Sequence, residues 1–307
     1  MSGWRAALVA VLVGGVVLAI GWWLNRPDSP GTTGTTDPPA GAGVLACPPA
    51  LDLACDGLAA EVGAARRTYT GGEVTEGTVV IAEAAALPEA AEPFARTPVA
   101  IAVWHEKAPT LSETCGGIDV ACLVENAGRA WNDLGGSASW GSLGLGLADA
   151  TQGAVDLDAW RLVDGAGPPA SFADAVRLRS ADDGTLLSDL VLFPTRADAV
   201  ISGEAAIAGQ LVNAQNRTGR LDVFYPTASG WVEYRVVAGP GRAADRLLSD
   251  LLAPELQAVL GSLGLRPLDG EATGLMQGLG QPGTPLPALT DAEKDSLIAS
   301  WTNTFGG

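Results

Sequence analysis

Residues 221–264 read LDVFYPTASGWVEYRVVAGPGRAADRLLSDLLAPELQAVLGSLG and contain two strand-like runs followed by an amphipathic helix. The runs Leu221–Tyr225 and Trp231–Val237 are rich in β-branched and aromatic residues, which favour strands. From Arg242 to Leu263, leucine and valine recur every three or four residues, as one buried helix face requires. Pro254 interrupts this pattern and predicts a break into two helices.

Other strand-like and helix-like segments alternate along the chain before this stretch. Apolar, β-branched runs predict strands at Thr78–Ala82, Val99–Trp104, Leu143–Leu147, Asp189–Phe193 and Ala199–Ser202. Between residues 123 and 134, apolar side chains recur at helical spacing. Strands that alternate with helices predict an α/β fold with largely parallel sheets.

The composition limits the partners and the chemistry of the chain. The 307 residues carry a formal net charge of −17, which repels a phosphate backbone, so we expect no nucleic-acid partner. His105 is the only histidine, which excludes a histidine-rich metal site. The sequence contains no dinucleotide fingerprint, no phosphate-binding loop and no nucleophile elbow. We therefore expect no cofactor and no enzymatic activity, with a hydrolase as the least favoured alternative.

The N-terminus carries an apolar segment, Trp4–Leu24, in which Arg5 is the only charged residue. A helix needs about 20 apolar residues to cross a bilayer, and Trp22 and Trp23 stand where interfacial aromatic residues would lie. The segment predicts a transmembrane signal anchor over residues 1–24, in a single-pass protein of the cell membrane whose body is extracytoplasmic. A cleaved signal peptide is the alternative.

Composition also predicts the limits of the globular part. Residues 25–43 are rich in Pro, Gly and Thr and predict a flexible linker. Residues 44–267 carry the strand and helix patterns, and residues 268–307 form a C-terminal extension. Within that extension, Thr290 and Glu293 predict a capping box at the start of a helix.

The four cysteines form two close pairs in the sequence, Cys47 with Cys55 and Cys115 with Cys122. An even number of cysteines in an exported chain suggests disulfides, although four cysteines permit three connectivities. We expect the two local pairings, because a short loop closes at a smaller entropic cost than a long one. Buried free thiols are the alternative.

Four stretches stand in an order and spacing that point to a family. They are TPVAIAVW (97–104), AWNDLG with WGSLGLGLADATQG (130–153), ADAVISGE (197–204), and VFYP with LLAPELQ and GLRP (223–267). In this order they resemble the bacterial extracellular solute-binding proteins of the type II periplasmic-binding fold. The last block is the most specific of the four.

The resemblance implies a two-lobed α/β fold with crossing strands as its hinge. Lobe 1 would comprise about residues 44–104 and 199–267, and lobe 2 about residues 105–198. It implies a protein, membrane-anchored by its N-terminal helix, that captures a small polar solute or anion between its lobes. The captured solute would pass to an ABC-type membrane transporter. The alternative is a degenerate, non-transport member that binds another cell-envelope protein.

The resemblance also implies a ligand site around the loop that opens the helix after residue 153. We expect Asp149, Thr151, Gln152 and Gly153 to contribute, because free N–H groups at a helix start favour an anionic or polar group. Capping of the helix by Asp149 or Thr151 alone is the alternative.

Glu204, after the return strand, and Tyr225 complete the expected ligand-binding residues. Solvent exposure of Glu204 and core packing of Tyr225 are the alternatives. Members of the family use Ser- and Thr-rich loops of the first lobe on the ligand, whereas the corresponding stretch 44–58 holds two cysteines. The segment Glu83–Leu87 reads EAAAL and likewise offers few polar side chains. The first lobe therefore lacks many of the polar ligand contacts that are usual in the family.

Overall fold

The computed structural model describes residues 43–213, 221–268, 276 and 279–306. The predicted anchor (1–24) and the predicted linker up to residue 42 lie outside the described residues. The prediction of a single-pass membrane protein has to be corrected, because none of the helices in the described part is long and apolar enough to cross a membrane.

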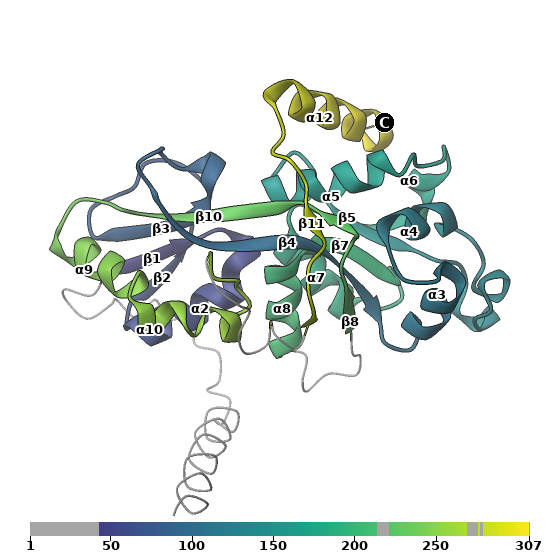
Figure 1. Cartoon of the computed structure of the whole chain (residues 1–307), viewed down its shortest axis with the longest axis horizontal. Coiled ribbons are helices and arrows are strands. Elements are labelled where there is room, and N and C mark those ends of the chain that lie inside the picture. The colour runs from purple at the N-terminus through teal and green to yellow at the C-terminus, as the bar shows by residue number, and fades with distance from the viewer. Residues whose placement is uncertain (1–42, 214–220, 269–275, 277–278, 307) are drawn as a thin grey trace, which may run out of the picture. The chain divides into compact units, whose positions relative to one another are not determined.

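Most strands of the described residues form one nine-stranded sheet, in the order β2-β1-β3-β10-β4-β7-β5-β6, with β8 paired to β4 (Figure 1). The strands are β1 Val44–Cys47, β2 Ala65–Thr68, β3 Thr78–Glu83, β4 Glu92–Trp104, β5 Leu145–Ala148, β6 Val176–Ser180, β7 Ala199–Gly203, β8 Leu221–Phe224, β9 Ala228–Ser229, β10 Trp231–Ala238 and β11 Thr284–Pro285.

The sheet consists of two halves that share β4. Residues 92–98 of β4 pair with β10, and residues 99–104 pair with β7 and β8. The first half therefore has the order β2-β1-β3-β10-β4 and the second half the order β6-β5-β7-β4-β8. In each half the fourth strand runs antiparallel to its neighbours. The fold is mixed α/β. The sequence predicts a largely parallel sheet, whereas β10 in the first half and β4 in the second half run antiparallel to their neighbours.

Helices follow the strands in both halves. They are α2 Asp52–Val62, α3 Ala108–Cys115, α4 Val120–Asn126, α5 Ala154–Gly165, α6 Phe172–Ala175, α7 Asp183–Leu192, α8 Glu204–Asn213, α9 Arg242–Leu251, α10 Pro254–Gln257 and α12 Asp291–Phe305. Short 3-10 helices include η1 Pro49–Leu51, η3 Trp131–Leu134 and η6 Leu260–Leu263. The predicted break at Pro254 is confirmed, since α9 ends at Leu251 and α10 begins at Pro254.

One predicted strand is wrong. Residues Asp189–Phe193 lie at the C-terminal end of helix α7 and just beyond it, not in the sheet. The Asp182 side chain caps this helix by accepting a hydrogen bond from the backbone N–H of Thr185. Leu186 and Leu190, one turn apart, are both fully buried, so the helix buries an apolar face that the short run 189–193 does not reveal.

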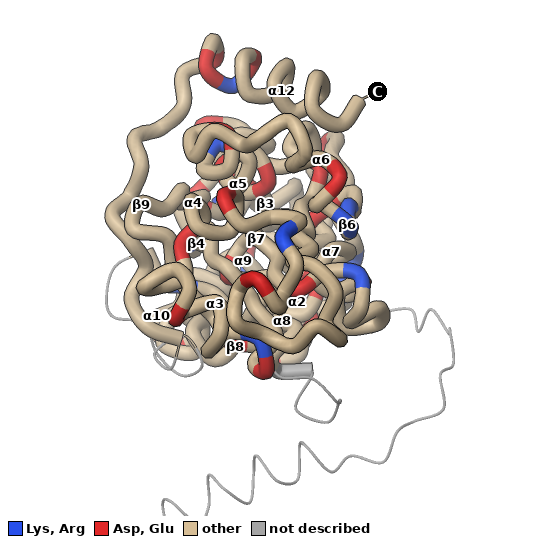
Figure 2. The backbone as a smooth tube through the Cα atoms, turned by 90° about the vertical axis from the view of Figure 1, so that its right-hand side faces the viewer, with Lys and Arg blue, Asp and Glu red and all other residues tan. Residues whose placement is uncertain are grey.

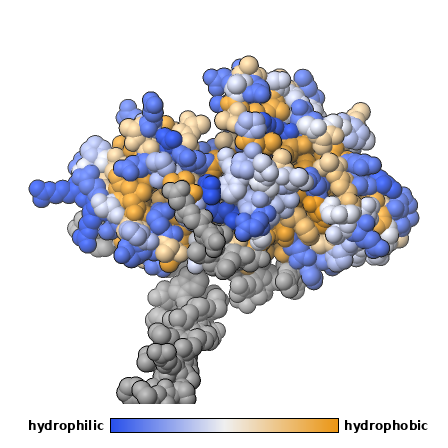
Figure 3. Space-filling model, in the orientation of Figure 1, coloured by the Kyte–Doolittle hydropathy of each residue, from blue (hydrophilic) through white to orange (hydrophobic). Residues whose placement is uncertain are grey.

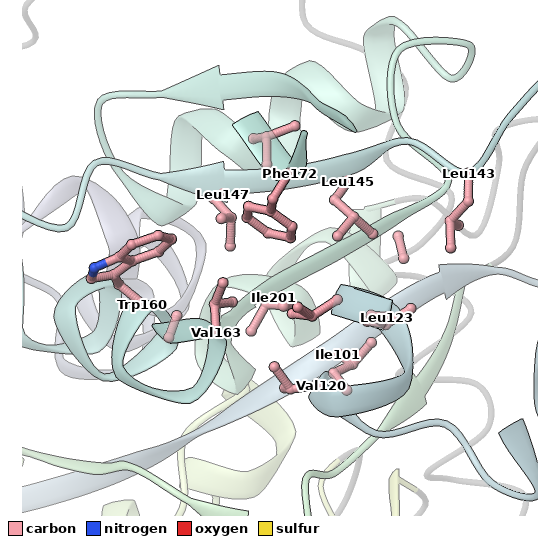
Figure 4. Close-up of a cluster of buried hydrophobic side chains, with 14 of the residues drawn as sticks. Ile101, Val120, Leu123, Leu143, Leu145, Leu147, Trp160, Val163, Phe172 and Ile201 are labelled. Carbon is pink, nitrogen blue, oxygen red and sulfur yellow. The ribbon is translucent and has the colours of Figure 1, made fainter. Parts of the chain in front are cut away.

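The largest core cluster belongs to the second half of the sheet (Figure 4). Trp160 of α5 lies against Phe172 and the two aromatic rings of α12, with its ring centroid 5.3 Å from that of Trp301. Helix α12 begins at the predicted capping box of Thr290 and Glu293 and packs over α5 (Figure 1). The C-terminal extension is therefore part of the packed body.

Both predicted disulfides are present. Cys47 and Cys55 join the end of β1 to α2, and Cys115 and Cys122 join α3 to α4. Polar and apolar side chains are intermixed over the face shown in Figure 3. The large apolar side chains that the described part exposes are Leu192, Phe193 and Val259.

Candidate functional site

The first turn of helix α5 is capped by a side chain from the first half of the sheet. Glu83, the last residue of β3, accepts hydrogen bonds from the backbone N–H groups of Ala154 (2.7 Å) and Val155 (3.5 Å). N–H groups in a first turn have no partner inside the helix, and the helix dipole stabilises a negative charge there. Burial nevertheless raises the pKa of Glu83. This contact joins β3 to a helix of the second half.

Two further carboxyl groups lie beside Glu83. Asp156, in the first turn of α5, is 6% exposed, and Asp183, the first residue of α7, is 3% exposed. Burial raises the pKa of Asp156 well above its ordinary value, and the charges of Asp183 and Glu83 raise it further. Burial also raises the pKa of Asp183, whose Oδ2 accepts a hydrogen bond from the backbone N–H of Gly203 (2.7 Å). We call Glu83, Asp156 and Asp183 the acidic junction.

The buried polar groups of this region bond to one another. The side chain of Asp183 forms hydrogen bonds with that of Asp156 and with the hydroxyl of Ser202, a residue that is fully buried on β7. Buried polar atoms are nearly always hydrogen-bonded, and these side chains meet that requirement largely among themselves.

A tyrosine and a fourth carboxyl group border the acidic junction. Tyr234 of β10 stands opposite Glu83 in the strand register and is 1% exposed. Its pKa is raised well above the ordinary value, first by burial and then by the charges of Glu83, Asp183 and Asp156. Burial raises the pKa of Asp158 to about 6, although Arg161 lies 3.7 Å away and lowers it.

The two halves approach each other closely around these groups. A Cβ atom at Gly184 of α7 would lie 2.7 Å from the backbone oxygen of Pro49, in 3-10 helix η1. A Cβ atom at Gly153 would lie 2.9 Å from Oδ2 of Asp156 and 3.2 Å from Oε1 of Glu83. At Gly184 the distance to the backbone oxygen is too short for a real Cβ atom, and at Gly153 the distance to Glu83 would be tight, so glycine at both positions favours the contact between the halves.

The predicted loop residues lie next to α5 but bond among themselves. Oδ1 of Asp149 accepts hydrogen bonds from the backbone N–H (2.9 Å) and the hydroxyl (2.8 Å) of Thr151, and Gln152 donates to the Thr151 hydroxyl (3.0 Å). Asp149 and Thr151 line a surface pocket of about 640 Å³ together with Arg177 and Arg179. These two arginines belong to β6, where Figure 2 shows basic residues. Of the predicted loop residues, Gly153 lies beside the acidic junction, next to Asp156 and Glu83.

Glu204 and Tyr225 belong to a separate buried network. Arg266 donates to both carboxylate oxygens of Glu204, through Nε to Oε2 (2.7 Å) and through a terminal nitrogen to Oε1 (2.6 Å). The Tyr225 hydroxyl donates to Glu204 as well, and Glu204 is fully buried. Each charge is paired, and no hydrogen bond within the described part joins this network to Asp149, Thr151 or Gln152.

None of the residues of the acidic junction is among the ligand-binding residues predicted from the sequence. Glu83 opens the segment EAAAL, which was expected to contribute little, and the carboxylates of the chain are too scattered to be paired by inspection. The position of Glu83 is the one local indication in the sequence. Glu83 directly follows the predicted strand Thr78–Ala82, and strand ends of an α/β sheet carry ligand-binding residues. Asp156 and Asp183 gave no comparable signal.

The acidic junction, with its neighbours Ser202 and Tyr234, brings together carboxyl groups, a hydroxyl group and a buried phenol from five elements of both halves. It contains no histidine and no cysteine, and no group of such ligands among the described residues could hold a metal ion. These polar groups lie where the two halves contact each other, and they are suited to binding a ligand through hydrogen bonds and charge.

No family model matches the chain, and no curated protein matches it in sequence. Two solved structures have a similar fold. The sulfate-binding protein SubI from Mycobacterium tuberculosis H37Rv is 12% identical over 80% of this chain and 93% of that chain, with a TM-score of 0.51. The periplasmic binding protein AfuA from Actinobacillus pleuropneumoniae, solved with fructose-6-phosphate, is 12% identical over 86% of this chain and 98% of that chain, with a TM-score of 0.50. The mixed α/β fold is therefore the one seen in substrate-binding proteins.

Proposed function

We propose that this chain is a solute-binding protein that captures a small polar solute between the two halves of its sheet and presents it to a membrane transporter. The observation that carries the proposal is the acidic junction, where polar groups from β3, α5 and α7 converge. Ligands of open α/β sheets bind beyond the carboxyl ends of strands, and Glu83 ends β3 in this way.

The proposed mechanism is closure about the strands that pass between the halves. Strand β4 changes its partner from β10 to β7 between Pro98 and Val99. A small rotation there would separate α5 and α7 from β3 and η1 and would open the acidic junction to solvent. In this motion residues 99–104 of β4 would move with β7 and β8 in the second half, whereas the lobe boundaries expected from the sequence, 44–104 with 199–267 and 105–198, assign them to lobe 1.

Among the residues proposed from the sequence, Gly153 remains the best supported as a ligand contact, because it borders Glu83 and Asp156. For Asp149, Thr151 and Gln152, we propose a role in shaping the turn before α5. For Glu204 and Tyr225, we propose a structural role with Arg266.

The experiment is a thermal-shift screen of the full chain against amines, amino acids, sugars and oxyanions, followed by hydrogen–deuterium exchange with any compound that binds. A solute at 100 times its Kd stabilises the folded state by about 2.7 kcal/mol. We expect protection at the end of β3 and at the first turns of α5 and α7. Absence of any stabilising solute, or protection confined to other segments, would refute the proposal and favour a protein-interaction role.

A further inference from the structure

A surface pocket of about 640 Å³ on the second half of the sheet is lined by three arginines. Arg177 and Arg179 are two positions apart on β6 and therefore share one face of the strand, and Arg196 precedes β7. All three residues are exposed. The C-terminal end of α12 and the loop after β5 form the rest of the described wall. We call this pocket the arginine pocket.

The three arginines have no negatively charged partner among the described residues. The ion pairs of this part of the chain engage other basic side chains, although the sequence has 35 acidic residues for 18 basic ones. Arg177 donates a hydrogen bond to the hydroxyl of Ser142, which is neutral. The pocket is therefore a concentration of positive charge on an acidic protein, and such a concave site attracts anions.

Nearby carboxylates are bonded to other groups. Asp149, the acidic residue of the described pocket wall, accepts two hydrogen bonds from Thr151 through Oδ1. Asp189 of α7 accepts a hydrogen bond from the hydroxyl of Ser180, the last residue of β6 (3.1 Å). Neither carboxylate forms an ion pair with an arginine of the pocket, so the neutralising group has to come from a ligand.

Aromatic rings support two of the guanidinium groups. Arg196 lies over the ring of Phe193, 4.5 Å from its centroid, and Arg179 lies over Phe305 at 5.3 Å. Arg179 also donates to the carbonyl oxygen of Phe305 (3.2 Å), at the C-terminal end of α12, where a positive charge is favourable. This contact accounts for one arginine but not for the other two. A guanidinium that stacks through its face still presents the N–H donors of its edge.

The volume and the donors of the arginine pocket define its ligand. Guanidinium groups bind carboxylate and phosphate oxygens through paired N–H donors. A volume of about 640 Å³ is typical of sites for organic molecules and is larger than a single inorganic ion requires. Three arginines against one carboxylate favour a ligand with more than one negative charge.

We propose that the arginine pocket binds a small organic anion with two or more carboxylate or phosphate groups, held by Arg177, Arg179 and Arg196. The inference goes beyond the proposed function, because no residue of the acidic junction lines this pocket. The described wall belongs to the second half and to α12, which packs on α5 of the same half. Binding therefore requires no closure of the two halves.

The test is titration calorimetry on the full chain with citrate as the carboxylate probe and fructose 1,6-bisphosphate as the phosphate probe. Fructose and sodium sulfate are run in parallel. We expect at least one of the two organic anions to bind, and fructose to give no signal. Affinity should fall several-fold between about 20 mM and about 200 mM sodium chloride, because salt screens exposed charges.

Three variants locate the site. Arg177→Gln and Arg196→Gln each remove one exposed charge, so we expect an unchanged Tm and affinity weakened by about tenfold, with a larger loss in the double variant. Arg67→Gln is the matched control. Arg67 is an exposed arginine on β2, the strand at the opposite edge of the sheet, and takes part in no ion pair of the described residues. This variant should change neither quantity.

Each remaining outcome decides between sites. If neither organic anion binds, or if the double variant binds as tightly as the wild type, the inference is wrong. An equal loss in Arg67→Gln would indicate attraction to overall charge and would also overturn it.

Hydrogen–deuterium exchange separates the inference from the proposed function. Protection of β6 and the end of α12 by the anion supports the arginine pocket. Protection confined to the first turns of α5 and α7 would place the anion between the halves, so that the proposed function survives and the inference fails. An anion that protects β6, together with no solute of any class that protects the end of β3, would refute the proposed function alone.

Discussion

Replacing Asp158 by Asn should stabilise the protein at neutral pH and have little effect in acid. Asp158 lies on α5, with 14% of its side chain exposed. Burial raises its pKa to about 6, against an ordinary value of 3.8. Because the folded pKa is the higher one, the folded chain holds this proton more tightly than the unfolded chain. The contribution of Asp158 to stability is therefore greatest below about pH 4 and is lost as the pH rises to about 6.

The magnitude follows from the two pKa values of Asp158. Their difference is about 2.2, and one pKa unit corresponds to about 1.4 kcal/mol. Above about pH 6 the charged carboxylate thus costs about 3 kcal/mol relative to a group that keeps its proton. Asparagine removes this cost, and the pKa of about 6 already includes the attraction of Arg161, which lies 3.7 Å away. The net gain in unfolding free energy should be about 2–3 kcal/mol.

The assay is urea denaturation of the wild type and Asp158→Asn at several values between about pH 4 and about pH 8. The difference in unfolding free energy should be close to zero at the acidic end and should grow to its full size by about pH 7. Glu83, Asp156 and Asp183 make both proteins pH-dependent, so only the difference reports on Asp158. A difference that is constant across the range would show that Asp158 has an ordinary pKa and would refute the reasoning.

Three further predictions concern the core, the buried ion pair and the contact between the halves. Trp160→Ala removes a side chain that is 1% exposed and should lower the unfolding free energy in urea by about 3–5 kcal/mol; a loss below about 1 kcal/mol would contradict the packing described. Arg266→Met leaves the carboxylate of Glu204 buried without its cation and should cost about 3–5 kcal/mol in the same assay. The double variant with Glu204→Leu should recover much of this loss, and a double variant no better than the single one would argue against a paired charge. Gly184→Val puts a side chain where a Cβ atom would already be 2.7 Å from a backbone oxygen and should increase the radius of gyration in solution scattering. Gly165→Val, which meets no atom within 4 Å, is the control and should leave the scattering unchanged.

Features fixed by neighbouring residues could be predicted from the sequence. The break before Pro254 follows from the missing N–H of proline, and the capping box of Thr290 depends on a residue three positions away. The local disulfides were predicted for the same reason, since their sequence separations are only 8 and 7. The strand runs at 99–104, 199–202 and 231–237 also lie within strands, because each is rich in β-branched or aromatic residues. The first two runs are buried throughout, whereas the third alternates between buried and half-buried residues.

The candidate site depends on spatial contacts between residues that are far apart in the sequence, and local sequence patterns do not reveal such contacts. Glu83 and Asp183 are 100 positions apart, and nothing in either local segment indicates that they share an environment. Burial raises the pKa of both groups, and the charge of Asp183 further raises the pKa of Glu83; this environment exists only once the chain is folded. Conversely, Glu204 was expected at a ligand, but the arginine that neutralises it lies 62 positions later.

The placement of β10 between β3 and β4 has a consequence for how the chain acquires its structure. During synthesis from the N-terminus, β3 and the start of β4 emerge long before residues 231–238, the strand that hydrogen-bonds to both. Until then each presents an open edge, which is a template for intermolecular pairing. Contacts of such long sequence separation form slowly, so folding should complete only after nearly all of the body has emerged. A chain truncated before β10 should aggregate rather than yield a stable half.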